Sequence, residues 1–287
     1  MRSSNELFKL IIRTANEDNR IRAVLLNGSR ANPEAAEDNF QDFDIIYVVN
    51  AMQPFLTDHS WIDVFGERIM LQMPDDMIIG NEVVKEKYSY SYLMLFKDGN
   101  RIDLTLFPLN KLQSDFPKDS LTKVLLDKDG LFTSISEPGL KDYLIRKPTQ
   151  KEFTDCCNEF WWVSTYVAKG LRRHQITYAK EMFDNYVRAM FMKMIEWSIG
   201  FEKGFSVPFG KAGRFMKDHV TPDLYKRILS TYSDAQEENT WAALFIMTTI
   251  FSELAAMVVK KSGFAYNQEE EQLVLAYLEK IIKSDPQ

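Results

Sequence analysis

The chain has 287 residues, of which 45% are hydrophobic and 26% charged, a composition that is ordinary for a soluble globular protein of one large domain or two average ones. Its net charge of −6 weighs against nucleic-acid binding, which favours basic surfaces, so we expect no nucleic-acid partner. No apolar run approaches the ~18 residues that a membrane span needs, so we expect no membrane partner either.

The first half of the chain alternates helix and strand patterns. Apolar residues recur at helical spacing over residues 4–19, a stretch that lacks the apolar core of a signal peptide. We predict strands at "IRAVLLNG", "DFDIIYVV" and "ERIMLQMP", and two more in "YSYLMLFKDGNRIDLTLFPL", joined around Asp98-Gly99. The stretch "SLTKVLLDKDG" is predicted to form a short helix and a turn. These elements predict a mixed sheet with flanking helices.

The second half of the chain reads as helices throughout. Thr149 as N-cap and Glu152 three residues later form a capping box, and the helix that follows should run to about Arg173. Further helical patterns cover roughly 175–200, 210–230, 236–261 and 267–283. The predicted fold class is therefore α+β, with a mixed-sheet domain at 1–147 followed by an all-α helical-bundle domain at 148–287.

The cysteines and histidines of the chain do not suggest a disulfide or a zinc site. Cys156 and Cys157 are adjacent, and neighbours on a helix point apart, so we expect free thiols and a reducing, cytoplasmic location. The three histidines, His59, His174 and His219, are scattered along the chain and lack the spacing of zinc ligands.

Two carboxylates interrupt the second apolar strand. Asp42 and Asp44 are two residues apart, so in a strand they point to the same face. Such neighbours repel one another and lose hydration when partly buried, which a sheet tolerates if a cation lies between them. Oxygen ligands favour magnesium or manganese. The alternative is a strand end with two solvated aspartates, and the pair alone does not decide between these interpretations.

Two further features favour the metal site. Asp103 lies in a later strand, on the face opposite its apolar neighbours, where a third carboxylate would complete a two-metal site. Gly28-Ser29 follows the first strand, where glycine lets the backbone approach a phosphate and the serine hydroxyl can donate to it. Arg30 supplies a positive charge for the same anion. This set of residues is much more specific than any one of its parts.

These motifs resemble those of a known superfamily. The stretch "GSRANPEAAEDNFQDFD" is similar to the glycine-serine, spacer, Asp-hydrophobic-Asp motif of the nucleotidyltransferases related to DNA polymerase beta. "NFQDFDIIYVV", "LFKDGNRIDLTLFP" and "KPTQKEFTDCCNEFWWVSTYVAKGLRR", with "GKAGRFMK" and "STYS", resemble the aminoglycoside 6-adenylyltransferases, which modify streptomycin. The resemblance implies ATP as co-substrate, a cationic aminoglycoside as acceptor, and two Mg²⁺ ions on Asp42, Asp44 and Asp103.

A stripe of acidic and aromatic residues follows the predicted helix after Thr149. Asp155, Glu159, Trp162 and Tyr166 recur at helical spacing, and together they could hold a guanidinium or ammonium group by ion pairing and cation–π contact. The alternative is a seam between domains that carries a few charges. The resemblance implies that this helix lines the aminoglycoside cleft, which favours Glu159 as a drug ligand.

Three basic or aromatic residues are candidates for the nucleotide side. Lys211 in "FGKAGRFMK" is predicted near a helix N-terminus, where free amides and the helix dipole favour an anion. In related drug adenylyltransferases a lysine in such a place meets the ATP phosphates, although a solvated lysine is the alternative. Tyr232 is a further candidate, and Lys169 is either a phosphate ligand or a solvated residue at a helix end.

The pattern and the resemblance together predict Mg²⁺-dependent transfer of AMP from ATP to a hydroxyl of an aminoglycoside, with hydroxyl 6 of streptomycin as the expected acceptor and drug resistance as the result. We expect a cytoplasmic monomer. The general base is open among Asp103, Glu82, Glu86 and Glu159, and Glu86 is also a candidate drug ligand.

Two other classes of function stay open. One is an adenylyltransferase that acts on another small molecule, such as a lincosamide, or on a protein. The other is a non-catalytic partner or antitoxin with a nucleotidyltransferase fold. The complete carboxylate set argues against an inactive site, and the long helical half argues against a minimal antitoxin domain.

Overall fold

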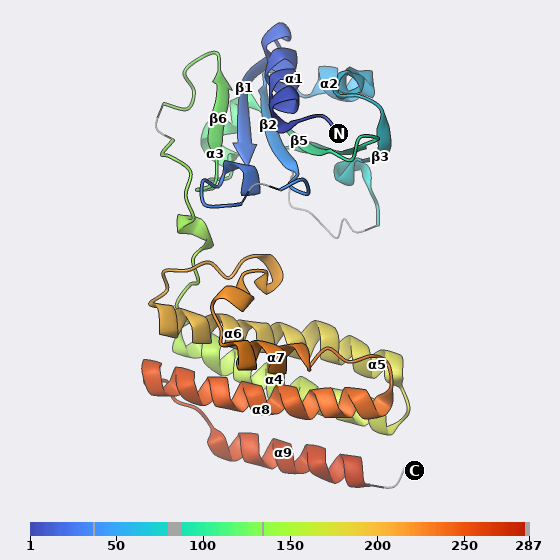
Figure 1. The fold of residues 1–287 in the computed structure, drawn as a ribbon, viewed down its shortest axis with the longest axis vertical. Helices are drawn as coiled ribbons and strands as arrows, with labels where there is room; N and C mark the ends of the chain where they lie inside the picture. The colour runs from blue at the N-terminus through green and yellow to red at the C-terminus, as the bar shows by residue number, and fades with distance from the viewer. Residues whose placement is uncertain (37, 80–87, 134, 285–287) are drawn as a thin grey trace. The chain divides into compact units, whose positions relative to one another are not determined.

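The computed structural model describes residues 1–36, 38–79, 88–133 and 135–284. Its contacts divide the chain into two compact units, Met1–Asp142 and Tyr143–Gln287 (Figure 1), which we call the sheet unit and the helical unit. The division falls five residues before the end of the predicted first domain, because the backbone N–H of Ile145 donates to the carbonyl of Val207 within the helical unit.

The sheet unit contains a six-stranded sheet in the order β3-β4-β5-β2-β1-β6. Its strands are β1 (Ile21–Asn27), β2 (Phe43–Val49), β3 (Arg68–Gln72), β4 (Tyr90–Phe96), β5 (Arg101–Pro108) and β6 (Lys123–Asp127). Paired strands are antiparallel, except that β2 and β5 run parallel. The predicted mixed sheet is confirmed, and so is the hairpin that joins β4 to β5 around Asp98-Gly99.

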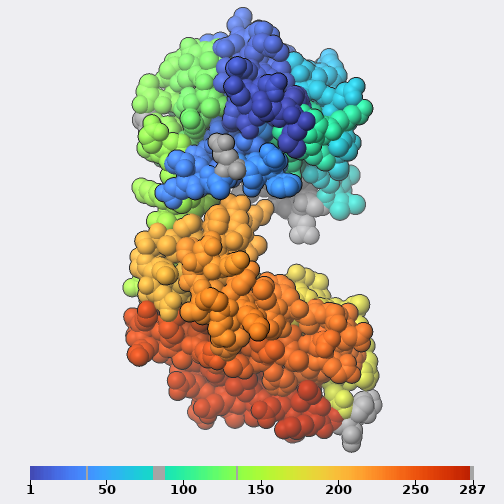
Figure 2. Space-filling model, viewed as in Figure 1, coloured from blue at the N-terminus to red at the C-terminus, as the bar shows by residue number. Residues whose placement is uncertain are grey.

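Helix α1 (Ser4–Glu17) covers one face of this sheet, and Figure 2 shows it in dark blue at the surface of the sheet unit. It begins at a capping box formed by Ser3 and Glu6, and it buries Leu7, Ile11 and Ala15 against the inward side chains of the strands. The shorter helical elements of the unit are η1 (Gly28–Ala31), α2 (Gln53–Thr57), η2 (His59–Phe65), η3 (Pro74–Asp76), η4 (Leu109–Lys111) and α3 (Leu112–Asp115).

The prediction of a short helix at residues 120–130 is wrong. Lys123–Asp127 form the strand β6, which pairs antiparallel with β1. Val124 packs with Ala23 and Leu25 in the apolar cluster on the sheet face opposite α1. The edge of β1 offers this short segment backbone hydrogen bonds and an apolar surface, and such tertiary contacts override weak local preference.

The helical unit contains α4 (Gln150–Arg172), α5 (Ile176–Glu181), the π-helical stretch η6 (Met182–Val187), α6 (Arg188–Lys203), α7 (Pro222–Leu229), α8 (Glu237–Ser262) and α9 (Gln268–Lys283). The predicted capping box is confirmed, because the Thr149 side chain accepts from the Glu152 backbone and the Glu152 side chain from that of Thr149. Helix α4 contacts α5, α6, α8 and α9. Cys156 and Cys157 are free and buried in the resulting core.

The helix predicted over 210–230 exists only in its second part, as α7. Before it, Lys211–Gly213 form a three-residue 3₁₀ turn, η7, in which Ala212 has a φ of 54° and Gly213 a φ of 76°. A right-handed α-helix requires negative φ, so it cannot pass through these residues. The expectation that Lys211 lies at the N-terminus of an α-helix is therefore wrong.

Helix α8 is the one helix of the described residues that is long and apolar enough to cross a membrane. We had not predicted a stretch of this length and hydropathy from the sequence. The core helix of a folded domain meets the same criterion. Half of the most apolar part of α8 is buried, and the ring of Phe251 stacks on Phe160 of α4 with centroids 3.6 Å apart. We therefore interpret α8 as the core helix of the helical unit.

Candidate active site

The three predicted aspartates lie on the sheet face opposite α1. The parallel pairing of β2 with β5 sets Asp44 level with Asp103, and residues paired in this way share a face. The flanking Phe43 and Ile45 are buried on the α1 side. Asp42 directly precedes β2, and the guanidinium of Arg101 forms ion pairs with both Asp42 and Asp103. The structure thus brings together the three carboxylates that the sequence pattern selected.

The electrostatics of this cluster disfavour the ionised forms of Asp42 and Asp44. Burial raises the pKa of Asp44 to about 6, with further contributions from the neighbouring charges of Asp103 and Asp42. The pKa of Asp42 is also raised, mainly by burial. A bound cation would relieve both effects, since it stabilises the charged form of each carboxyl group.

Arg101, which the sequence reading did not select, neutralises part of the cluster. Its Nε and Nη2 donate to the two carboxylate oxygens of Asp103, each at 2.7 Å. Its Nη1 lies 3.6 Å from Oδ2 of Asp42, and the hydrogen bonds to Asp103 raise the pKa of Arg101. The two-residue spacing of Arg101 and Asp103 in one strand could have revealed this pair, because it places both side chains on one face.

The oxygen ligands of the cluster are of the type that binds magnesium, although they are not arranged as a complete coordination site. Among the described residues, no three His, Cys, Asp or Glu side chains are grouped as metal ligands, and both oxygens of Asp103 bind Arg101. One buried oxygen, Oδ1 of Asn27, has no hydrogen-bond partner within the described part of the chain. Asn27 is paired with Asp44 across β1 and β2. Such oxygen donors are those that magnesium prefers.

Gly28 leaves the space that the Asp44 carboxylate occupies. It has a φ of 71°, and a Cβ atom at this position would lie 2.2 Å from Oδ2 of Asp44. Glycine is therefore required both for the backbone conformation and for the space that the carboxylate occupies. Ser29 follows in η1, half-buried directly after the end of β1.

Arg30 lies beside this turn but binds the protein itself. Its guanidinium donates to the backbone carbonyls of Gln41 and Asp42 and to the hydroxyl of Ser4. It also lies over the ring of Phe43, 3.9 Å from the centroid. These contacts fasten the segment that carries Asp42, and a role of Arg30 as a phosphate ligand stays a prediction.

In the helical unit, the predicted acidic and aromatic stripe borders two different cavities. Asp155 and Glu159 line a cavity of about 500 Å³ between α4 and α6. Trp162, Tyr166 and Lys169 line another, of about 610 Å³, between α4 and α9. The structure therefore separates the two aromatic candidates and Lys169 from the acidic pair, although all five side chains follow one side of α4.

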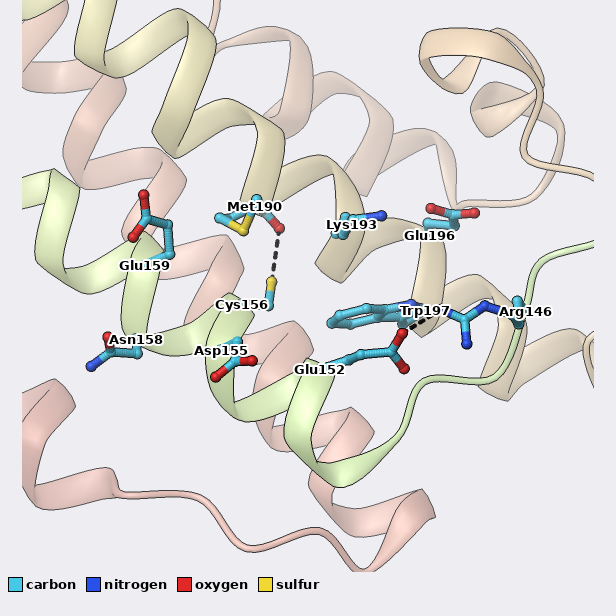
Figure 3. A pocket seen from close by; sticks show the side chains of 10 residues that line it. All are labelled: Arg146, Glu152, Asp155, Cys156, Asn158, Glu159, Met190, Lys193, Glu196 and Trp197. Atoms are coloured by element: carbon cyan, nitrogen blue, oxygen red, sulfur yellow. Dashed lines mark hydrogen bonds and ion pairs between the residues drawn. The ribbon is translucent and has the colours of Figure 1, made fainter. Parts of the chain in front are cut away.

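The cavity between α4 and α6 has an excess of negative charge. Figure 3 shows Asp155 and Glu159 on α4 opposite Lys193 and Glu196 on α6. The charged residues that line it are Arg146, Glu152, Asp155, Glu159, Lys193 and Glu196. Burial raises the pKa of Glu196, a residue that the sequence reading missed because it lies in an otherwise apolar helix. Four acids against two bases make this cavity suitable for a cationic ligand.

Comparison with known proteins assigns the family. The family profile described as streptomycin adenylyltransferase matches residues 1–281. The chain belongs to the streptomycin adenylyltransferase family. Aminoglycoside 6-adenylyltransferases of Campylobacter jejuni and Bacillus subtilis (strain 168) are 41% and 39% identical to it over 273 and 274 residues. These matches cover 95% and 94% of this chain, and 94% and 95% of the relatives.

A solved structure, a crystal structure of an aminoglycoside 6-adenyltransferase from Bacillus subtilis, is 35% identical to this chain. The alignment covers 99% of this chain and 100% of that one, with a TM-score of 0.48. The family match confirms the resemblance that the motifs indicated, and with it the enzyme class, a nucleotidyltransferase of the adenylyltransferase type.

The remaining residues predicted for this streptomycin adenylyltransferase family member are placed less favourably. Lys211 is exposed on the η7 turn, so the argument from a helix dipole no longer supports it. The ring of Tyr232 lies against the guanidinium of Arg188, 3.9 Å from ring centroid to Cζ. Glu82 and Glu86 lie outside the described residues. The nucleotide and drug roles of these side chains stay predictions.

Proposed function

We propose that the chain transfers the AMP group of ATP to hydroxyl 6 of streptomycin, releases pyrophosphate and thereby confers resistance to the drug. As a family member it is an aminoglycoside adenylyltransferase, with ATP and an aminoglycoside as substrates. The observation that carries the residue-level proposal is the cluster of Asp42, Asp44 and Asp103 on one sheet face, beside Gly28.

In this mechanism the sheet unit holds the nucleotide. Asp42, Asp44 and Asp103 would hold two magnesium ions, and when bound these ions would neutralise the triphosphate and lower the pKa of the drug hydroxyl. The Ser29 hydroxyl donates to a phosphate oxygen, and Gly28 lets the backbone of η1 approach the phosphates. A carboxylate oxygen of Asp103 accepts the proton of the attacking hydroxyl, which must lie in line with the bond to the leaving pyrophosphate.

The acidic cavity between α4 and α6 supports a cationic acceptor. Its lining has two more acids than bases, and streptomycin carries guanidinium groups that such a lining attracts. Glu159 is exposed at this cavity and forms no ion pair within the described residues. Asp155, in contrast, pairs with Lys151. We therefore propose Glu159 as a drug ligand, with Asp155 and Glu196 as further acids of the same site.

We also propose that the enzyme acts as a cytoplasmic monomer. The buried, unpaired thiols of Cys156 and Cys157 suit a reducing compartment, which also supplies ATP. Size-exclusion chromatography with light scattering would test the monomer, since a dimer would give twice the mass.

The decisive experiment is mass spectrometry of streptomycin incubated with the purified protein, ATP and Mg²⁺. We expect a product heavier than the drug by one AMP group, together with one pyrophosphate per modified molecule. Spectinomycin, kanamycin and a lincosamide serve as competing acceptors. If AMP appears on one of these or on a protein while streptomycin stays unmodified, the substrate assignment is wrong although nucleotidyl transfer is retained.

Glu159→Gln is expected to raise the KM for streptomycin about tenfold, because the drug loses a charged partner that the neutral amide does not replace. The KM for ATP should change little, since the substitution lies in the proposed drug site. Raising the salt concentration should narrow the difference between the variant and the wild type by screening the lost attraction. Steady-state kinetics with each substrate varied in turn measures all three quantities.

The matched control for this variant is Glu181→Gln. Glu181 is an exposed glutamate of the same unit, at the end of α5, outside the lining of the acidic cavity. Its substitution removes the same charge and should leave both KM values unchanged. Equal KM values for streptomycin in the two variants would remove Glu159 from the drug site.

A further inference from the structure

We propose that Arg101 is a built-in counter-cation of the carboxylate cluster, which competes with the divalent metal for Asp103. The proposal rests on the proposed function, in which Asp42, Asp44 and Asp103 bind the metal. It assigns to Arg101 a positioning role: the guanidinium holds the carboxylates in the metal-free protein and withdraws from Asp103 when the metal binds.

The first observation is that the guanidinium takes up the ligand atoms. Both carboxylate oxygens of Asp103 accept hydrogen bonds from Arg101, in the two-point geometry that Arg forms with carboxylates. The same guanidinium points its Nη1 at Asp42. A metal ion that binds an oxygen of Asp103 must therefore displace at least one of these donors.

The second observation is that the side chain of Arg101 is partly exposed to solvent. Its side chain is 43% exposed, compared with 20% for Asp103, so it can rotate into solvent without opening the apolar core. With all three carboxylates ionised, the guanidinium groups of Arg101 and Arg30, which both act on Asp42 and Asp44, still leave an excess of one negative charge. In the described ion pairs Arg101 binds Asp103 and Asp42 but not Asp44. The cluster therefore retains the charge that attracts a divalent ion while Arg101 limits its repulsion.

If Arg101 competes with the metal, its removal has a different effect on metal affinity than if Arg101 only supports the fold or arranges the ligands. If Arg101 competes with the metal, its removal makes the metal bind more tightly while the metal-free protein becomes less stable, because the carboxylates lose their counter-charge. If Arg101 instead only supports the fold or arranges the ligands, its removal leaves the affinity unchanged or weakens it. Metal binding thus separates the two roles without any measurement of activity.

The experiment is a calorimetric titration of the metal-free, full-length protein with Mn²⁺. Arg101→Gln is expected to bind Mn²⁺ about fivefold more tightly than the wild type, the factor that ~1 kcal/mol gives at about 1.4 kcal/mol per tenfold. Arg101→Lys keeps the charge but loses the two-point contact, so its affinity should lie between the two. Melting of the metal-free proteins should occur at a lower temperature in Arg101→Gln.

The matched control is Arg22→Gln. Arg22 also forms a two-point contact, through Nε and Nη2 with the carboxylate of Asp129, in the same unit. Its substitution removes the same charge and the same kind of contact from another part of the sheet unit. We expect the melting temperature to fall and the affinity for Mn²⁺ to stay at the wild-type value.

The outcomes distinguish this proposal from the proposed function. If the wild type does not bind Mn²⁺, or if Asp44→Asn binds it equally well, the metal-binding role of the cluster is wrong, and the role of Arg101 with it. If binding depends on Asp44 but Arg101→Gln and Arg101→Lys bind no more tightly than the wild type, the competition is refuted while the metal site stands.

Discussion

Asp44→Asn is expected to lower the rate of adenylyl transfer by ~10³-fold or more while raising the stability of the metal-free protein. The loss follows from removing a carboxylate that we propose as a ligand of the metal, because a metal ion's stabilisation of the transition state is worth several kcal/mol. The gain in stability follows from the pKa of Asp44, which burial raises from its usual value of 3.8 to about 6. The amide has no charge to bury.

The pH dependence of this gain has a definite sign. Because the pKa of Asp44 is higher in the folded chain than in the unfolded one, folding favours the protonated form. The stability that this form contributes is present below pH ~4 and is lost as the pH rises through about 6. Above pH ~7, Asp44→Asn should therefore be more stable than the wild type by ~1–2 kcal/mol, a value reduced for the partial exposure of the site to solvent.

The rate of pyrophosphate release measures the loss of transfer. Thermal melts in the presence of a metal chelator, at pH 5 and pH 7.5, measure the gain in stability and its pH dependence. Asp129→Asn is the control, because Asp129 pairs with Arg22 away from the cluster. It should keep its activity and lose stability rather than gain it. Turnover near the wild-type level in Asp44→Asn would exclude the carboxylate from the catalytic site.

Gly28→Ala is expected to reduce kcat/KM by ~10²-fold or more. The added methyl group would overlap Oδ2 of Asp44, so either the carboxylate or the turn must move, and a displacement of ~1 Å in a reacting group can cost ~10²-fold. The φ of 71° adds backbone strain of ~1–2 kcal/mol for any residue with a side chain. The variant should therefore be both less active and less stable.

Gly130→Ala separates strain from overlap. Gly130 has a φ of 67°, close to that of Gly28, but a Cβ atom there would meet nothing within 4 Å. The Gly130→Ala variant should therefore have similar backbone strain to Gly28→Ala but an unchanged rate of adenylyl transfer. The measurement is kcat/KM normalised to the folded fraction from circular dichroism. If both variants lose the same activity, the close approach of Gly28 to Asp44 has no role in the chemistry.

The carboxylate cluster of the sheet unit could be predicted from sequence because strand residues alternate between two faces. The alternation alone places Asp44 and Asp103 opposite their buried neighbours, and the structure confirms this. It does not reveal which strands are neighbours, so the contact of Arg101 with Asp42 was missed. The strand β6 was missed for a related reason, since its stability comes from the edge of β1 rather than from its own five residues.

In the helical half, the capped start of α4 could be predicted, whereas the capped start of α7 and the partners of each helix face were not predicted. The capping box at Thr149 placed the start of α4 correctly. The acidic and aromatic stripe on α4 is real, but α6 and α9 divide it between two cavities, and no local pattern specifies which helix packs where. The positive φ of Ala212 excludes an α-helix there, and the only local signal for it is the pair of flanking glycines, Gly210 and Gly213.

The parallel pairing of β2 with β5 also determines when the site can form during synthesis. It joins Asp44 to Asp103, which are 59 positions apart (103 minus 44), and the segment between them contains β3 and β4. Such long-range pairing forms slowly, and a growing chain cannot make it before β5 has left the ribosome. We therefore expect Asp44 and Asp103 to be separated and solvated in nascent chains that have not yet paired β2 with β5. The charge repulsion of the cluster would then arise only together with the strands that restrain it.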